Sequence, residues 1–401
     1  MAELVVGSVP RGDDYFDQKP LIEEVWARLR KDSVLLVAPR RFGKTGLMFR
    51  LLDAPRAGFR PVYLDVESID NPANFIIEVL ARLWRDDQFG RAVQGLWAGL
   101  KDARDWFTNL VEEVDVGEIK VKLREKTDMP VNWRMYGDRL MGILGAADMP
   151  LLLLIDEFPI MVGRMIQKKR EEAVEFVRWF RSVRLSPENR TRFVIGGSTN
   201  ILYSLETVGL VDAINDLCPI RLRPFDSVTA QQYLDAVFAP HELLLDSRVR
   251  ARMLELVGEP VPYLLALLAQ AVLGRHRAHN DEINVPLVDA AFDELLSTAT
   301  PFLHYWARLN EHYPGCESAV AKAILNVISR AEGSVKRDTL YQIYVQTCGV
   351  PSGSGTQDAF VRLMWKLDND FYIVADEQGY RFFSRVLKLW WRRQYGYQQE
   401  G

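Results

Sequence analysis

The sequence predicts an α/β protein with a parallel sheet at its centre and helices on both faces of that sheet. Over the first two hundred residues, apolar segments of strand length alternate with amphipathic segments of helix length. The apolar segments are rich in Val, Leu and Ile and lack the alternating polar positions of a strand with one solvated face. Strands buried on both faces are typical of parallel sheets enclosed by helices, which is why we expect this fold class.

The individual elements follow in order along the chain. Buried strands are expected at 33–39 (SVLLVAP), 61–66 (PVYLDV), 151–157 (LLLLIDE) and 192–197 (RFVIGG). Helical spacing of apolar residues predicts helices at 18–31, 44–53, 71–85 and 170–185. Residues 86–135 interrupt this alternation with a Trp-rich helical stretch and a small hairpin around Gly117, so we expect an insertion at the rim of the sheet.

The pattern changes after RLRPF (221–225), where it becomes wholly helical to about residue 310. From Ser318 it predicts two helices, a glycine-rich joint, a third helix containing 356–367, and an alternating pair of strands, YIVAD and YRFFS. That order resembles a winged helix. We therefore expect a core at 1–224 with its insertion at 86–135, a helical lid at 225–312 and a winged-helix domain at 313–401.

Composition excludes several classes of protein. A chain of 401 residues buries enough surface to fold without disulfide bonds or structural metals. Its three cysteines, Cys218, Cys316 and Cys348, lack the close spacing of a zinc ribbon, so we expect buried thiols in a reducing cytosol. No leader peptide or apolar run of about 20 residues is evident, which predicts a cytoplasmic protein without membrane contact. His276 and His279 lie in a polar stretch that we expect to be a surface loop, without a third metal ligand.

The strongest chemical signal is APRRFGKTG at 38–46, which matches the phosphate-loop (Walker A) pattern of P-loop NTPases except that Ala38 replaces its first glycine. Gly43 lets backbone N–H groups approach phosphates, Lys44 supplies a charge to the β- and γ-phosphates, and Thr45 offers its hydroxyl to Mg²⁺. A coincidental strand–turn–helix is the alternative. The residues expected to bind nucleotide in this loop are Ala38, Pro39, Arg40, Arg41, Phe42, Gly43, Lys44, Thr45 and Gly46.

The second signal is LLLLIDEF at 151–158, a buried strand that ends in two carboxylates, as in a Walker B motif. Asp156 is expected to hold Mg²⁺, and Glu157 to polarise the attacking water as the catalytic residue together with Lys44. A solvated strand end is the alternative. The two motifs together predict binding of ATP with Mg²⁺.

These residues also carry a family resemblance. APRRFGKT, LLLLIDEFP, FVIGGSTN and the C-terminal YRFFSRVLKLWWRR resemble the STAND/AAA+-related archaeal-type ATPases, which are close to the origin-recognition ATPases. The resemblance covers most of the chain except the insertion at 86–135. It implies an ATPase core, a helical lid and a winged helix, with an adenine nucleotide as the ligand.

The resemblance further implies roles for residues outside the two motifs. Ser198, Thr199 or Asn200 would read the γ-phosphate as a sensor, with Ser198 and Asn200 favoured; capping of the next helix is the alternative. An arginine finger would come from Arg181 or Arg184, although a solvated basic face is the preferred explanation of the stripe that they share with Arg178. Pro262 would lie near the adenine, although a proline in the first turn of a helix needs no functional reason.

We therefore expect a slowly hydrolysing ATP-dependent switch whose nucleotide state controls the winged helix. The alternatives are an ATP-dependent DNA-binding regulator or initiator-like protein, and a scaffold in a defence or toxin-linked complex.

Residues 318–401 carry 11 basic and 8 acidic side chains, a small excess for a DNA reader. Arg362, Lys366, Arg381 and Arg385 would have to supply the phosphate contacts. Trp365, Trp390 and Trp391 are candidates for aromatic surface that contacts a protein partner or another copy, the kind of partner that we favour. For the tail that carries Trp390 and Trp391, however, the interpretation that we prefer is a closing helix packed on the wing.

Overall fold

The computed structural model describes residues 4–396 apart from 13–14, 17, 39–40, 57, 85, 88, 92–128, 198–200 and 299. Most of the insertion expected at 86–135, including its hairpin around Gly117, therefore lies outside the described residues. The chain forms two compact units. The first comprises Met1–Asp17, Arg41–Gly43 and Arg223–Gly401, and the second comprises Gln18–Arg40 and Lys44–Leu222.

The second unit is built on a five-stranded sheet in which every strand pair is parallel. Its strands are β1 (Val34–Val37), β2 (Arg60–Asp65), β3 (Leu151–Asp156), β4 (Arg192–Ile195) and β5 (Cys218–Arg221). Their spatial order is β2-β3-β4-β1-β5. The strand that follows β3 in the chain thus lies between β3 and β1, and the carboxyl ends of these three strands meet at one edge.

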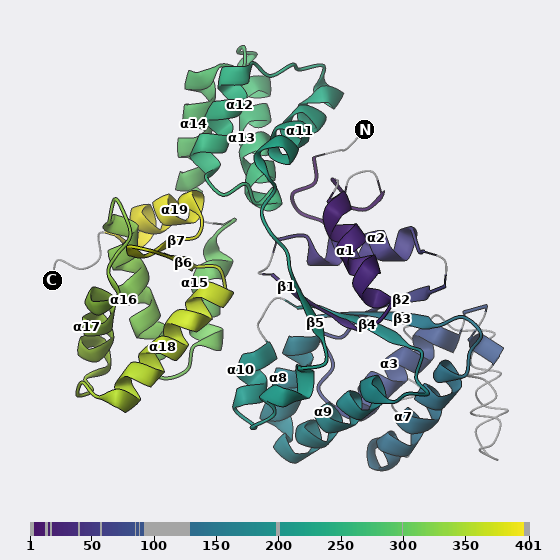
Figure 1. Cartoon of the computed structure of the whole chain (residues 1–401). Coiled ribbons are helices and arrows are strands. Elements are labelled where there is room, and N and C mark those ends of the chain that lie inside the picture. Colours follow the sequence, from purple (N-terminus) through teal and green to yellow (C-terminus); the bar gives the residue numbers. More distant parts are fainter. Residues whose placement is uncertain are drawn as a thin grey trace. The chain divides into compact units, whose positions relative to one another are not determined.

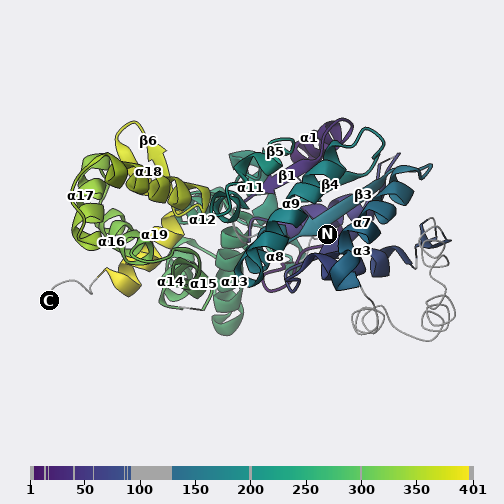
Figure 2. The same cartoon turned by 90° about the horizontal axis from the view of Figure 1, so that it is seen from below.

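Helices cover both faces of this sheet, as the sequence predicts (Figures 1 and 2). One face carries α1 (Lys19–Leu29) and α2 (Lys44–Asp53). The other carries α3 (Pro72–Trp84), α7 (Met129–Gly145), α8 (Phe158–Lys168), α9 (Arg170–Leu185) and α10 (Ile201–Glu206), and a short 3₁₀ helix, η2, spans Val211–Ile214. The predicted α/β fold class is confirmed.

The core of this unit lies between β3 and the helices of the face that carries α3, α7, α8, α9 and α10. Every residue of β3 is buried, which explains why its sequence shows no polar alternation. Phe176 and Phe180 project from the same side of α9 because they are four residues apart, and their rings stack 6.0 Å apart. Phe75 of α3 meets Phe176 edge-on at 5.2 Å, so α3 and α9 share one aromatic cluster.

The first unit is built mainly of helices, with a two-stranded hairpin. Its helices are α11 (Ser227–Phe238), α12 (Ser247–Val257), α13 (Pro262–His279), α14 (Val285–Ser297), α15 (Leu303–His312), α16 (Glu317–Arg330), α17 (Arg337–Cys348), α18 (Ser354–Asn369) and α19 (Arg385–Tyr395), with a 3₁₀ helix, η3, at Ala239–His241. Side chains at several helix starts accept backbone N–H groups that would otherwise be unpaired, as Asp226 does for Thr229 and Asn284 does for Leu287. From α16 to α19, the order of helices and strands is the one expected from the sequence.

The hairpin expected near the C-terminus is formed by β6 (Ile373–Asp376) and β7 (Gly379–Phe382), which pair antiparallel. Helix α18 buries the side chains of Phe360, Leu363, Met364 and Leu367 and leaves Trp365 43% exposed. Trp390 and Trp391 of α19 are fully buried, so the suggestion that they offer aromatic surface is wrong. They pack against Phe302, Trp306 and Phe382 because α19 turns its apolar face inward as the closing helix.

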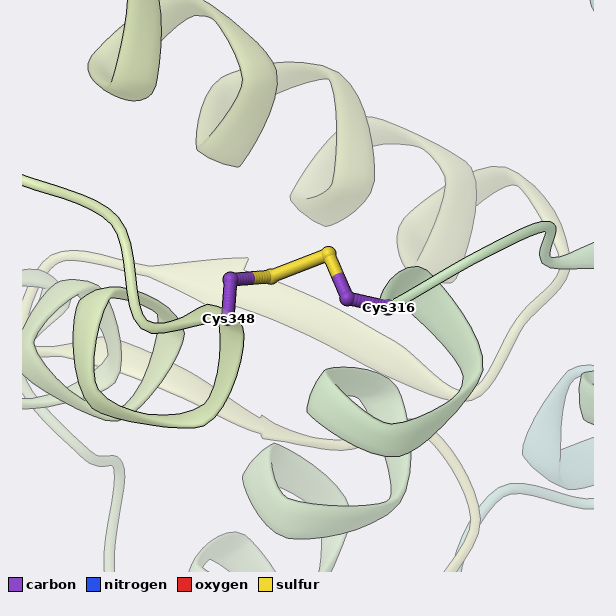
Figure 3. The surroundings of a disulfide bond; sticks show 2 residues. All are labelled: Cys316 and Cys348. Carbon is purple, nitrogen blue, oxygen red and sulfur yellow. A yellow bond between two sulfur atoms is a disulfide. The ribbon is translucent and has the colours of Figure 1, made fainter.

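Two further expectations are corrected. Cys316 and Cys348 form a disulfide that joins the start of α16 to the end of α17, with their Cα atoms 5.7 Å apart (Figure 3), rather than remaining buried thiols. Cysteines 32 residues apart are brought together by the antiparallel turn between the two helices, which spacing alone does not reveal. Cys218 is a free, half-buried thiol.

His276 and His279 lie in the last turn of α13 and not on a loop. Within the described residues, no group of three or more His, Cys, Asp or Glu side chains is placed to hold a metal. The helices of the described part of the chain are also too short or too polar to cross a bilayer.

Candidate functional site

The phosphate-loop sequence connects β1 to the start of α2. Ala38 is buried directly after β1, and Lys44 and Thr45 begin α2, so the loop delivers them to a helix N-terminus. Gly43 has φ +89°, a left-handed conformation that favours glycine. Pro39 and Arg40 lie outside the described residues.

Lys44 is held within its own loop. Its Nζ atom donates to the Ala38 backbone oxygen at 2.7 Å, and the side chain is only 6% exposed. A buried ammonium requires hydrogen-bond acceptors. The fold therefore holds the Lys44 ammonium where the loop sequence predicts that phosphate binds, and the Ala38 backbone oxygen is one of its acceptors.

The two motifs meet at the carboxyl end of β3. The Thr45 hydroxyl donates to Oδ2 of Asp156 at 2.6 Å, although the two residues are 111 positions apart in the sequence. The backbone N–H of Glu157 donates to Oδ1 of the same carboxylate at 3.1 Å. Hydroxyl and carboxylate oxygens are the ligands that Mg²⁺ prefers, so the residues present fit that ion.

Glu157 occupies an uncommon backbone conformation for a residue with a side chain. Its φ of +58° and ψ of +27° are left-handed, and it immediately precedes α8. Non-glycine residues in this region cost of order 1–3 kcal/mol and are concentrated at functional sites. A Cβ atom on Gly197, just beyond β4, would lie 3.4 Å from Oε2 of Glu157, so a glycine leaves room for this carboxylate.

The sensor candidates Ser198 and Asn200, together with Thr199, lie outside the described residues. The strand that leads to them, β4, lies between β1 and β3. Strand β1 leads into the phosphate loop and β3 ends at Asp156, so β4 is flanked by the strands of the two motifs.

The arginine-finger candidates are engaged within their own unit. The side chain of Arg184 is 2% exposed and donates to Asp216 twice, from Nε at 2.8 Å and from Nη2 at 2.9 Å. Arg181 is 30% exposed and donates to Asp212 at 2.7 Å and to Asn215 at 3.0 Å. These pairings give each arginine a structural role in joining α9 to the segment that follows α10.

Residues Arg41–Gly43 belong to the first unit, where Arg41 lies near the predicted lid proline. Pro262 is the first residue of α13, and the guanidinium carbon of Arg41 lies 4.8 Å from the ring centre of Tyr263. Phe42 is 3% exposed, and its ring centre lies 5.1 Å from that of Phe371. Burial raises the pKa of the Tyr263 phenol, and the charge of Arg41 acts in the opposite direction.

Sequence reasoning missed Tyr63 of β2. Its hydroxyl donates to Oδ2 of Asp156 at 3.2 Å, the same oxygen that accepts from Thr45. Burial raises the pKa of the Tyr63 phenol, and the negative charges of Asp156 and Asp65 raise it further, so the hydroxyl stays protonated and remains a donor. The sequence carries no signal for this contact, because the parallel pairing of β2 with β3, in which Asp65 lies opposite Asp156, is what brings Tyr63 to the carboxylate.

Several solved structures are similar to this chain. The chain is similar to a Walker-type ATPase of Pyrococcus abyssi, with a TM-score of 0.63 and 15% identity over 97% of this chain and 99% of that chain. It is also similar to the ORC2 protein of Aeropyrum pernix (TM-score 0.49, 13% identity, 96% and 95% of the two chains). A third similar structure is the RuvB Holliday junction branch migration motor of Thermotoga maritima (TM-score 0.42, 12% identity, 93% and 94%).

No protein-family model matches the sequence, and neither does any curated protein. The similarity to the Pyrococcus abyssi structure spans nearly the whole of both chains. Together with the all-parallel strand order, it defines the class of fold. The chain has the α/β fold of a P-loop ATPase, followed by a helical C-terminal region.

Proposed function

We propose that this protein binds ATP with Mg²⁺ and hydrolyses it slowly, as a molecular switch of the STAND/AAA+ type. The observation that carries the proposal is the hydrogen bond between Thr45 and Asp156, which joins the two sequence motifs at one edge of the sheet. The fold shared with a Walker-type ATPase supports it.

Each residue of the site has a role that follows from its chemistry. Lys44 exchanges its bond to Ala38 for the phosphate oxygens of ATP, while the loop N–H groups and the start of α2 favour the negative charge. Thr45 and Asp156 hold Mg²⁺. When bound, the ion neutralises charge that develops on the phosphates.

Glu157 is proposed to orient and deprotonate the attacking water. Its left-handed backbone turns the chain sharply after β3, so its side chain leaves the strand in a different direction from that of Asp156. Ser198 or Asn200 is proposed to read the γ-phosphate as the sensor, and Arg181 or Arg184 to act as the arginine finger. Arg181 or Arg184 would have to leave its present carboxylate partner to act in a second copy of the chain.

The variant Glu157→Gln tests the division between binding and hydrolysis. It keeps the shape and one hydrogen-bonding oxygen but removes the base, so the full-length variant should bind ATP like the parent and leave it intact. Binding is measured by calorimetry and turnover by release of inorganic phosphate. Hydrolysis at the parent rate would remove Glu157 from the mechanism.

The C-terminal region is proposed to be a winged helix that contacts a protein partner or another copy of this chain. Lys366 is bonded to Glu317 at 2.7 Å, and Arg385 is bonded to the backbone oxygen of Glu255 at 2.7 Å. Arg381 lies 3.8 Å from Glu259. Lys366, Arg381 and Arg385 are therefore each engaged by a carboxylate or a backbone oxygen of their own unit, and Trp365 on α18 is 43% exposed, as suits a surface that contacts protein.

A DNA-binding regulator is the second candidate, and the exposed Arg362 beside Trp365 on α18 favours it. The test is titration with random duplex DNA at 100 mM salt, with and without ATP. A few phosphate contacts give non-specific dissociation constants of about 10⁻⁴–10⁻⁶ M. Submicromolar binding that is lost in Arg362→Ala/Lys366→Ala would replace the protein-facing proposal with the DNA-binding one.

A further inference from the structure

The carboxylate of Asp156 is fixed on both of its oxygens. Oδ1 accepts the backbone N–H of Glu157, and Oδ2 accepts two hydroxyls, from Thr45 at 2.6 Å and from Tyr63 at 3.2 Å. Thr45 and Glu157 belong to the two nucleotide-binding motifs. Tyr63 belongs to neither, and it reaches the carboxylate from the neighbouring strand.

The fold places Tyr63 there through the register of the sheet. Strand β2 pairs in parallel with β3, with Tyr63 opposite Leu154 and Asp65 opposite Asp156. Alternate residues of a strand lie on the same face, so Tyr63 and Asp65 share one side of β2. The hydroxyl of Tyr63, at the end of a long side chain, reaches forward along the strand to the carboxylate.

The ring of Tyr63 is anchored as well as its hydroxyl. It packs on the ring of Phe49 with centres 4.8 Å apart, and Phe49 lies one turn beyond Thr45 on α2. Tyr63 thus contacts the helix that carries the phosphate-loop residues through its ring and the Walker B carboxylate through its hydroxyl. A ring held by such packing has few alternative rotamers, so the position of its donor is fixed.

We propose that Tyr63 is a positioning residue that orients the Asp156 carboxylate for Mg²⁺; this inference rests on the proposed function. An isolated carboxylate rotates freely about its last bond, whereas one with donors on both oxygens keeps one orientation. Partners that orient metal ligands in this way typically change metal affinity about 10- to 100-fold when they are removed. Binding of nucleotide without metal does not involve this carboxylate and is unaffected.

The test uses the full-length protein with Tyr63→Phe, which keeps the ring on Phe49 and removes only the hydroxyl. Mn²⁺ serves as the spectroscopic probe, and free Mn²⁺ is followed by electron paramagnetic resonance during titration of the protein saturated with ADP. The variant is expected to bind Mn²⁺ about 10-fold or more weakly. Its affinity for ADP in the presence of a chelator should equal that of the parent. Tyr136→Phe is the matched control, since it also removes a hydroxyl from a buried tyrosine of the same unit.

The outcomes separate this inference from the proposed function. If the parent binds no nucleotide, the proposed function fails and the inference fails with it. If the parent binds ADP and Mn²⁺ but Tyr63→Phe keeps its Mn²⁺ affinity within twofold, the inference alone is overturned. An equal loss of metal-free ADP binding in Tyr63→Phe would also overturn it, because the hydroxyl would then support the fold and not the metal ligand.

Discussion

Replacement of Arg184 by alanine should destabilise the second unit strongly. The guanidinium makes two bonds to Asp216, a third to the Ala213 backbone oxygen at 2.5 Å, and lies 4.7 Å from the ring centre of Phe180. Both side chains of the ion pair are largely buried, at 2% and 13% exposure. Removing one partner of a buried pair leaves the other charge uncompensated, which typically costs about 3–5 kcal/mol. We therefore expect Arg184→Ala to lower the free energy of unfolding by about that amount.

Urea denaturation followed by tryptophan fluorescence measures this effect. The matched control is Arg178→Ala, six residues earlier on the same helix, where an exposed arginine should change stability by no more than about 0.5 kcal/mol. The double variant Arg184→Ala/Asp216→Ala should lose less unfolding free energy than the sum of the losses in the two single variants, because it leaves neither charge of the pair uncompensated. Parent-like stability in Arg184→Ala, combined with lost ATP hydrolysis, would refute the structural role and favour the arginine finger.

Two further predictions concern the disulfide and the glycine beside Glu157. A bond that closes 32 residues should stabilise the protein by about 3.7 kcal/mol in the chain-entropy model, so Cys316→Ser/Cys348→Ser should unfold at lower urea than the parent. An unchanged midpoint under oxidising conditions would contradict this. In Gly197→Ala the new Cβ would lie 2.4 Å from Cδ of the rigid Pro159 ring, which should cost about 1–3 kcal/mol and slow ATP hydrolysis by displacing the nearby Glu157 carboxylate. Parent-like values of both the urea midpoint and the rate of phosphate release would count against it.

Much of the fold could be predicted because its strands carry an unambiguous signal. The LLLLID sequence of β3 is buried at every position, so its apolar run could only suit a central parallel strand. Strand β5 was not predicted, since its four residues, CPIR, include a proline and two exposed positions. The disulfide was also missed, because only the antiparallel packing of α16 and α17 brings Cys316 close to Cys348.

The candidate site was predictable where sequence spacing fixes geometry and not where the register of the sheet does. Lys44 and Thr45 follow from a loop whose spacing places them at a helix start. Tyr63 did not stand out, because a tyrosine in a buried strand is usually a core residue and the sequence does not specify which strand lies beside β3. The left-handed backbone of Glu157 was likewise hidden, since glutamate has no local preference for it.

The most direct test of the central claim is the affinity of the full-length protein for ATP in the presence of Mg²⁺, compared with that of Lys44→Ala by calorimetry. A charged hydrogen-bonding group contributes about 1.5–3 kcal/mol, so the variant should bind about 10- to 100-fold more weakly while its circular dichroism spectrum stays like that of the parent. Equal affinity in a folded Lys44→Ala protein, or a parent that binds no ATP, would contradict the assignment of residues 38–46 as a phosphate loop.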